Sequence, residues 1–234
     1  MSKSKIIVDL ANSTVSTETA LKRAKVLFSE LNDDRLLNWV NCEISGYSNS
    51  QALPDYRIVT GNLIGSYVKG SIATHATFSN VSLSLGNMPD DIKRKLLTVS
   101  FIEGVEALRK LLESSESSTG DLGKIIPADF FPMIAMHNSD PYMMITSARV
   151  IIGPHRIQSV FSAIENRLLD ALILLEKEFG ILDELDINTE SKSPEELQSI
   201  IERLTVIIYN DNSVSLGNGN RINKSNIASS NTSS

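Results

Sequence analysis

Apolar residues recur every three or four positions in two neighbouring stretches near the start of the chain, residues 17–31 and 33–47. This spacing places them on one face of an α-helix. Asn32 stands between the stretches, where its side chain can cap the second helix, and two aspartates follow it in that helix's first turn. The pattern predicts an antiparallel pair of short helices. Their apolar faces are Ala20, Ala24, Leu27, Phe28 and Leu31 in the first helix, and Leu36, Leu37, Val40 and Ile44 in the second.

The helical period disappears between residues 56 and 86, where β-branched and aromatic residues are punctuated by Gly and Ser. This composition predicts two or three antiparallel strands. Pro89, followed by two aspartates, opens a helix that we expect to continue to about residue 115, with a break or bend at Gly104. Residues 114–123 have the composition of a solvated loop. A short helix at 126–137 and a strand at 141–152 complete this part.

The longest periodic segment starts at Pro154 and extends to Phe179, and Gly180 is a natural helix stop. Its broad apolar stripe predicts the spine of the fold. The stripe consists of Ile157, Val160, Phe161, Ile164, Leu168, Ala171, Leu172, Leu175 and Phe179. The predicted fold class is therefore α+β: an N-terminal helix pair, a small antiparallel sheet and a long helix, followed by a C-terminal helix and a β-forming tail.

The order of these patterns predicts the domain organisation. Residues 1–180 are expected to form one globular domain, and the acidic and polar residues 181–193 a linker. Ser193, Pro194 and Glu196 make a capping box with proline at the first helical position, which predicts a short helix at 194–204. Residues 205–228 form an Asn/Gly-rich, β-forming tail, and residues 229–234 are expected to be disordered.

Composition narrows the classes of function. The net charge of -6 and the isoelectric point near 5.2 argue against a dedicated nucleic-acid binder, because such proteins neutralise phosphates with Lys and Arg. No apolar run approaches the roughly 18 residues of a membrane span, and the N-terminus lacks a signal peptide, so we expect a cytoplasmic protein. One cysteine, Cys42, and three scattered histidines provide no ligand spacing for a metal, and no cofactor is expected.

A cluster of rare residue types follows the first predicted helix. The residues are Trp39, Glu43, Gly46, Tyr47, Pro54, Tyr56 and Arg57. Trp39 and Glu43 are four residues apart and share a helix face, from which both can reach the loop that brings Arg57. We expect Glu43 to pair with Arg57 beside the indole of Trp39. The favoured interpretation is a structural lock between the helix pair and the sheet.

This segment, "LNDDRLLNWVNCEISGY" followed by "LPDYR", resembles the AbiTii domain family of bacteria, found in abortive-infection and other phage-conflict genes. The later run "SVFSAIENRLLDALILLEKEFGI" is similar to the closing helix of that family. The resemblance covers about the first 180 residues. It implies a role in antiviral defence, as a toxic effector or as its partner, and it brings no catalytic residues with it.

No constellation in the chain reaches the specificity of a catalytic motif, so a non-enzymatic protein is favoured. Glu165 and Asp170, with Arg167 and His155 nearby in sequence, can be assembled into a metal-assisted nuclease site. The same spacing is ordinary for a solvated helix face, which is the favoured interpretation. An enzymatic toxin acting on nucleic acid or nucleotide, and a non-catalytic scaffold or neutralising partner of a neighbouring toxin, remain as alternatives.

The tail alternates with period two, which is typical of an extended strand. One side holds Asn212, Val214, Leu216, Asn218, Asn220 and Ile222. Three structures fit this pattern: a hairpin turning at Asn218 and Gly219, a stacked assembly of tails from neighbouring chains, or disorder. Our leading hypothesis is a defence effector or sensor whose partners are other copies of itself, through this tail, and a further protein of the defence system.

Overall fold

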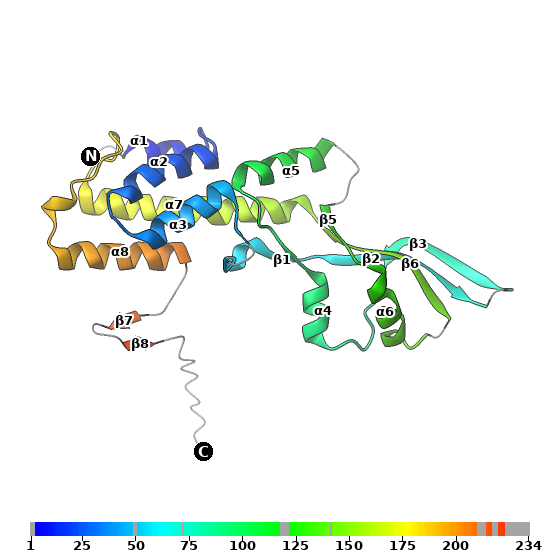
Figure 1. The fold of residues 1–234 in the computed structure, drawn as a ribbon. Coiled ribbons are helices and arrows are strands. Elements are labelled where there is room, and N and C mark those ends of the chain that lie inside the picture. Colours follow the sequence, from blue (N-terminus) through cyan, green and yellow to red (C-terminus); the bar gives the residue numbers. More distant parts are fainter. Residues whose placement is uncertain are drawn as a thin grey trace, which may run out of the picture. The chain divides into compact units, whose positions relative to one another are not determined.

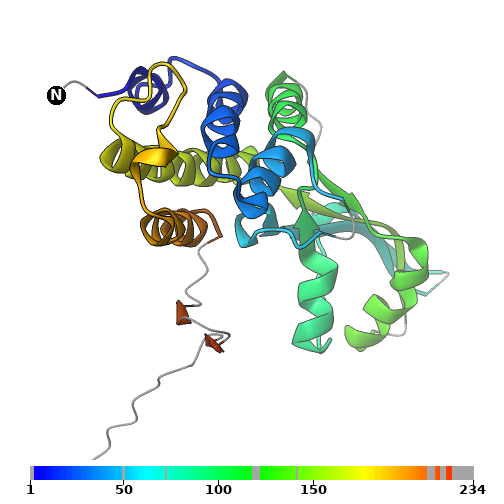
Figure 2. The ribbon, with the colours of Figure 1, turned by 60° about the vertical axis from the view of Figure 1, so that its left-hand side comes forward.

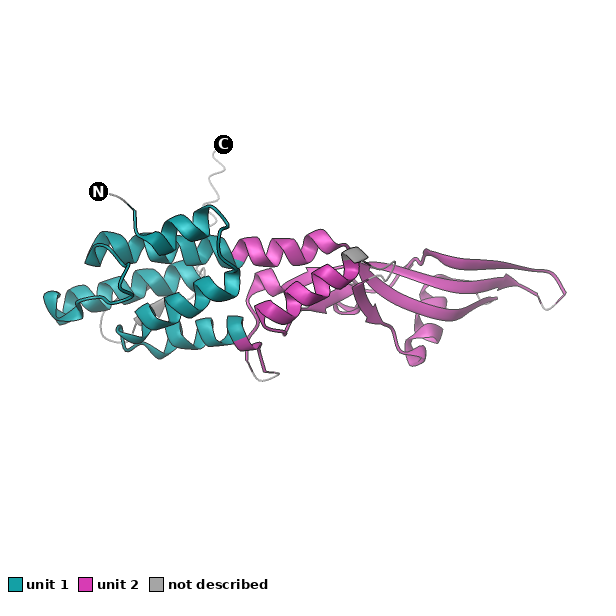
Figure 3. Ribbon diagram, turned by 90° about the horizontal axis from the view of Figure 1, so that it is seen from above, with its two compact units in different colours: residues 1–44, 164–234 teal, residues 45–163 magenta. Residues whose placement is uncertain are grey.

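The structure is a computed structural model that describes residues 3–48, 51–71, 73–117, 122–140, 142–209, 214–216 and 220–222. The chain divides into two compact units, which Figure 3 shows in different colours. Unit 1 consists of residues 1–44 and 164–234, and unit 2 of residues 45–163.

Unit 1 is built from helices that surround the second part of the long helix α7. Figures 1 and 2 show this part of α7 between α1 and α2 on one side and α8 on the other. Five residues of the apolar stripe of α7, Ile164, Leu168, Ala171, Leu172 and Leu175, are each 0% exposed here. The helices are α1 (Lys5–Ala11), α2 (Thr17–Ser29), α3 (Asp34–Ser45, of which residues 34–44 belong to this unit), α7 (Pro154–Phe179, from residue 164 on) and α8 (Pro194–Tyr209).

The bounds of α7 agree with the sequence prediction, and Gly180 ends the helix with a φ of +89°. The capping box of α8 is also confirmed: the hydroxyl of Ser193 accepts from the N–H of Glu196 at 3.2 Å, and the Glu196 carboxylate accepts from the N–H of Ser193 at 2.9 Å. α8 continues to Tyr209, five residues beyond the expected end at 204. Its last turn is held because Ile208 is buried and the Arg167 side chain donates to the Ile208 carbonyl at 3.2 Å.

The cap of α3 differs from the prediction. Asp33, and not Asn32, accepts from the N–H groups of Arg35 and Leu36, at 2.9 and 3.2 Å. Asn32 instead has a φ of +52° and turns the chain between the two helices. The buried residues of α3 are Leu36, Trp39, Val40, Cys42 and Glu43.

The N-terminal helix α1 and the segment 181–193 are both fixed to unit 1. Ser4 is fully buried; its N–H and hydroxyl donate to the Glu176 carboxylate at 2.6 and 2.7 Å, and its hydroxyl accepts from the N–H of Leu182 at 2.9 Å. Leu182 and Ile187 are buried, and residues Thr189–Ser191 form a 3-10 turn. The helix α1 was not expected from the sequence, and the predicted boundaries of the globular domain and linker stay predictions.

Unit 2 contains a four-stranded antiparallel sheet of order β3-β2-β6-β5 and a separate two-stranded ribbon, β1 with β4. Small antiparallel sheets combined with helices confirm the α+β fold class. The strands are β1 (Ile58–Thr60), β2 (Asn62–Gly70), β3 (His75–Ser82), β4 (Thr98–Ser100), β5 (Leu122–Ile125) and β6 (Met143–Ile152). The helices are α4 (Asp90–Leu97), α5 (Val105–Ser117), α6 (Phe131–His137) and the first part of α7; 3-10 turns cover Asp55–Arg57 and Ala128–Phe130.

One face of the sheet carries the core of unit 2. Buried and exposed positions alternate along most of β6, as expected for a sheet with a single covered face. Figures 1 and 2 show α4 and α6 on the same side of the sheet. The core cluster joins Leu63 of β2 and Met143, Ile145, Ala148 and Val150 of β6 to Leu96 of α4 and Ile134 of α6.

The prediction of a helix from residue 89 to about 115 is wrong for the middle of that range. It ends at Leu97, because Thr98–Ser100 pairs with Ile58–Thr60 as β4 and the chain becomes helical again only at Val105. The predicted loop at 114–123 is also wrong at both ends, since α5 extends to Ser117 and β5 begins at Leu122. At β4 and β5, pairing with a distant strand overrides local propensity.

In the tail, β7 (Val214–Leu216) and β8 (Asn220–Ile222) pair antiparallel. The register aligns Val214 with Ile222 and Leu216 with Asn220. A two-residue turn at Asn218 and Gly219 would have aligned Leu216 with Arg221, so the register differs from that hairpin by one residue. These four residues belong to the side that the sequence pattern assigned to Val214 and Leu216, and Ser215 aligns with Arg221 on the other side. Asn212, Asn218 and the expected disordered end, 229–234, lie outside the described residues.

Candidate functional site

Arg57 is the buried centre of the motif residues in unit 2. Its side chain is 0% exposed, and its guanidinium donates to the carbonyls of Phe101 and Glu103 at 2.9 and 2.7 Å. The ring of Tyr47 lies 4.9 Å from the guanidinium carbon, within the range of a cation–π interaction. The Arg57 carbonyl in turn accepts from the N–H of Phe101 at 2.9 Å. Arg57 thus fastens the segment 101–103 to the start of β1.

Gly46 and Tyr47 hold the same segment from the other side. The N–H of Tyr47 donates to the Ile102 carbonyl at 2.7 Å. Gly46 has a φ of +97°, and a Cβ added to it would lie 2.8 Å from the Ile102 carbonyl oxygen and 3.1 Å from the backbone nitrogen of Gly104. Only glycine fits this close approach without a shift of the backbone.

The remaining motif residues lie in α3 or at the 3-10 turn before β1. Trp39 and Glu43 are 1% and 0% exposed in α3. The carbonyl of Pro54 accepts from the N–H of Arg57 at 2.9 Å, which starts the 3-10 turn containing Tyr56. Glu43 belongs to unit 1 and Arg57 to unit 2, and their pairing stays a prediction. The structure therefore brings Gly46, Tyr47, Pro54 and Arg57 together.

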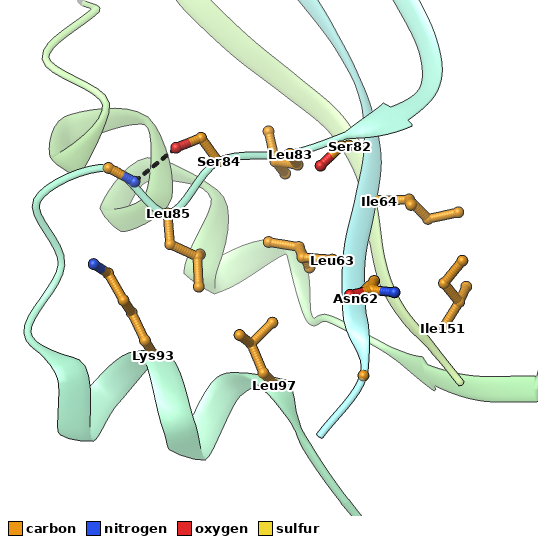
Figure 4. A pocket seen from close by; sticks show the side chains of 12 residues that line it. Asn62, Leu63, Ile64, Ser82, Leu83, Ser84, Leu85, Lys93, Leu97 and Ile151 are labelled. Carbon is orange, nitrogen blue, oxygen red and sulfur yellow. Dashed lines mark hydrogen bonds between the residues drawn. The ribbon is translucent and has the colours of Figure 1, made fainter. Parts of the chain in front are cut away.

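A pocket of about 590 Å³ lies in unit 2, between α4 and the ends of β2 and β3. Figure 4 shows Lys93 and Leu97 extending from α4 towards Leu63 and Leu85. Apolar and polar groups share its wall. The lining residues are Gly61, Asn62, Leu63, Ile64, Ser82, Leu83, Ser84, Leu85, Gly86, Lys93, Leu97 and Ile151.

The loop that forms one wall of this pocket is anchored to α6. Asn138 donates its side-chain amide to the Ser84 carbonyl at 2.8 Å, and the N–H of Asn87 donates to the His137 carbonyl at 2.9 Å. Gly86, whose N–H donates to the Ser84 hydroxyl at 3.0 Å, has a φ of +52°. A Cβ at Gly86 would lie only 2.0 Å from the His137 carbonyl oxygen, so the wall requires glycine there.

The opposite wall, α4, is fixed at its C-terminal end by Lys124 of β5. The ammonium donates to the carbonyls of Thr98 and Lys95 at 2.5 and 3.3 Å, and burial lowers the pKa of Lys124. Lys93 is the cation of the pocket wall. Its side chain is 32% exposed, and its ion-pair partner Asp90 is 3.7 Å away and 92% exposed, so the pair is weak. The pocket thus offers a cation beside apolar side chains, an arrangement suited to a small anion with an apolar body.

Two of the residues considered for nuclease chemistry, Glu165 and Arg167, have other contacts. Glu165 accepts from the Thr17 hydroxyl at 2.6 Å, Arg167 donates to the Ile208 carbonyl, and Asp170 is exposed. In the part of the chain that the structure describes, no group of three or more His, Cys, Asp or Glu side chains is placed to hold a metal ion. The structure therefore gives Glu165 a role in packing α2 against α7.

The pocket residues were not among the predicted site residues. They come from three separate segments, 61–64, 82–86 and 93–97, with Ile151. The sequence signals that mark this region are the glycines at 61 and 86, but neither indicates that the segments meet.

The described residues define an α+β protein with a buried arginine, Arg57, that is bonded to the segment 101–103, and with an open pocket beside its sheet. The chain belongs to the AbiTii family, whose model matches residues 4–200. The family match supports a role in abortive-infection defence. No curated protein and no solved structure matches the chain. Among the described helices, none has the length and apolar character needed to cross a lipid bilayer.

Proposed function

We propose that this protein is a non-catalytic effector or sensor of abortive infection that self-associates through its C-terminal tail. The observation that supports this is the β7–β8 pair, in which each strand has only three residues. Among the described strands these two pair only with each other. A two-stranded hairpin is marginally stable in water, so an ordered tail requires further strands or another surface to pack against. Other copies of the same chain supply them.

Charge favours the same assembly. Residues 210–234 contain Arg221, Lys224 and one acidic residue, Asp211, so their net charge is +1, while residues 1–209 carry 20 basic and 27 acidic residues and a net charge of -7. Strands from this weakly charged segment repel one another little when they pair.

A truncation experiment tests self-association. The cut belongs after Tyr209, because Ile208 is buried and the Tyr209 hydroxyl donates to the Arg35 carbonyl at 2.8 Å. We expect the full chain to form large species in light scattering and the Δ210–234 variant to be monomeric. The Δ223–234 variant, which keeps β7 and β8, is the matched control and should assemble. Large species of equal size in Δ210–234 would show that the tail is not responsible.

The pocket supports a second, compatible role, in which unit 2 senses a small amphipathic anion. Octanoate is a suitable probe, since its carboxylate can reach Lys93 while its chain contacts Leu63, Leu85 and Leu97. We expect octanoate to raise the melting temperature of the wild type and to have a smaller effect on Lys93→Ala. Lys95→Ala, which removes an exposed cation from the same helix, is the control. Equal shifts in all three proteins would exclude binding at Lys93.

A further inference from the structure

The strand β3 forms one edge of the four-stranded sheet and is open to a further strand. Among the described strands, β3 pairs with β2 alone. Seven of its eight residues are exposed, and the eighth, Val81, is half-buried. An edge strand presents a row of unpaired backbone N–H and C=O groups to any extended segment that can reach it.

Apart from one register shift near the end of β3, this edge lacks the usual features that prevent strand addition. Natural edge strands are protected by charged side chains, proline, strong bulges or shortness. The sequence of β3, HATFSNVS, contains no Lys, Arg, Asp, Glu or Pro. The opposite edge strand, β5, has four residues, one of them Lys124. One irregularity is present in β3, where the register shifts opposite residues 65–67, and the stretch from His75 to Phe78 is regular.

The exposed edge is also held in shape without a partner. The rings of Tyr67 and Phe78 stack across β2 and β3 with centroids 4.8 Å apart and an interplanar angle of 21°. Lys69 of β2 forms an ion pair with Asp140 at 3.1 Å. A preformed edge loses little conformational entropy when a strand is added to it.

We propose that the tail hairpin of one copy, β7 paired with β8, adds through one of its two strands to the β3 edge of a second copy. This inference rests on the proposed self-association and identifies the surface that receives the tail. The tail has the period-two pattern and weak charge of a donor strand, and 25 residues of the chain follow Tyr209. The described residues of β7 and β8 pair with each other, and in the proposed contact this pair comes from another molecule.

Addition to β3 provides the further strands and the apolar core that the isolated hairpin lacks. The donor strand joins a sheet that already has four strands and a core of α4 and α6 on one face. Each copy has one donor tail and one acceptor edge, which are different surfaces. Contacts of this heterologous kind produce rings or open chains of molecules.

The test places charge at the acceptor edge while the tail is left intact. The double variant His75→Lys/Thr77→Lys adds two cations to exposed positions of β3, opposite a tail that contains Arg221. Ile125→Lys/Ser147→Lys, at exposed positions on β5 and β6, adds the same charge to the same sheet and is the control. We expect the control to assemble like the wild type, and the β3 variant to have the size of Δ210–234 in light scattering.

Binding of a labelled peptide of residues 210–228 gives a measurement that does not depend on assembly. The peptide should bind the Δ210–234 protein saturably. It should bind at least tenfold more weakly to Δ210–234 protein that carries the two β3 substitutions. Equal melting temperatures of these two proteins confirm that both are folded. If the β3 variant assembles normally while Δ210–234 does not, tails pair with tails: the inference is wrong and the proposed function stands. A full chain with the size of Δ210–234 overturns both.

Discussion

At the scale of single residues, Gly46 and Gly180 allow the stability cost of backbone strain to be distinguished from the cost of steric conflict. Both have positive φ, +97° and +89°, but a Cβ at Gly180 meets nothing within 4 Å, whereas one at Gly46 lies 2.8 Å from the Ile102 carbonyl oxygen. Gly180→Ala should cost about 1 kcal/mol of unfolding free energy, the penalty of the conformation alone. Gly46→Ala should cost roughly 2–4 kcal/mol, because the segment held by Arg57 must also move.

Urea unfolding of the two alanine variants measures this difference. A loss at Gly46 no larger than the loss at Gly180 would mean that the segment 101–104 yields easily, and that the motif residues of unit 2 do not form a rigid lock.

Glu176 gives a residue-scale prediction for pH. Burial raises the pKa of this carboxyl, but hydrogen bonds from the Lys3 ammonium and from the N–H and hydroxyl of Ser4 outweigh it and lower the pKa to about 2. Because the folded pKa lies below the unfolded value of 4.5, the charged carboxylate stabilises the fold above about pH 4.5. This contribution is lost as the pH falls from about 4.5 to about 2.

The variant Glu176→Gln isolates that contribution. The difference in unfolding free energy between wild type and variant should be constant from pH 5 to 8 and should shrink steadily below pH 4.5. Denaturant titrations at pH 7 and pH 3 measure it. A difference at pH 3 equal to that at pH 7 would show that the charge of Glu176 does not hold the N-terminal segment.

At the scale of elements, what could be predicted from the sequence depends on whether an element is specified locally. The helix α7 was predicted because its stripe repeats over 26 residues, and the start of α8 because Ser193 and Glu196 form a local cap. The strand β4 was missed because Thr98–Ser100 is short and lies inside an amphipathic run, and its partner Ile58–Thr60 is some 40 residues away. The pocket requires three such distant segments to meet, and no local signal encodes that.

The last turn of α8 provides an element-scale prediction. Deleting residues 205–234 removes the buried Ile208 and the hydrogen bond from Tyr209 to the Arg35 carbonyl, whereas deleting 210–234 removes neither. The shorter protein should lose about 2–5 kcal/mol of unfolding free energy relative to Δ210–234, the usual cost of removing a large buried aliphatic side chain. Thermal or urea unfolding compares the two. Equal stability would mean that the last turn of α8 is not part of the core of unit 1.

At the scale of the whole molecule, the charge is unevenly distributed: residues 1–209, here called the body, are acidic, and the tail is nearly neutral. Residues 1–209 carry a net charge of -7, so bodies brought together by their tails repel one another, and salt screens this repulsion. Backbone hydrogen bonds between strands are not weakened by salt in the same way as surface ion pairs. Strand pairing through the tail therefore predicts an assembly that persists, and grows, as the salt concentration rises.

Light scattering of the full chain between about 50 mM and 1 M sodium chloride tests whether the assembly persists. Over this range of salt the Debye length falls from above 10 Å to about 3 Å. We expect particle size to be maintained or to increase, while Δ210–234 remains monomeric throughout and shows that salt alone does not precipitate the body. Dissociation of the full chain into single molecules at high salt would mean that ion pairs hold the copies together. The tail, whose charged residues are Asp211, Arg221 and Lys224, would then act through those side chains and not through its backbone.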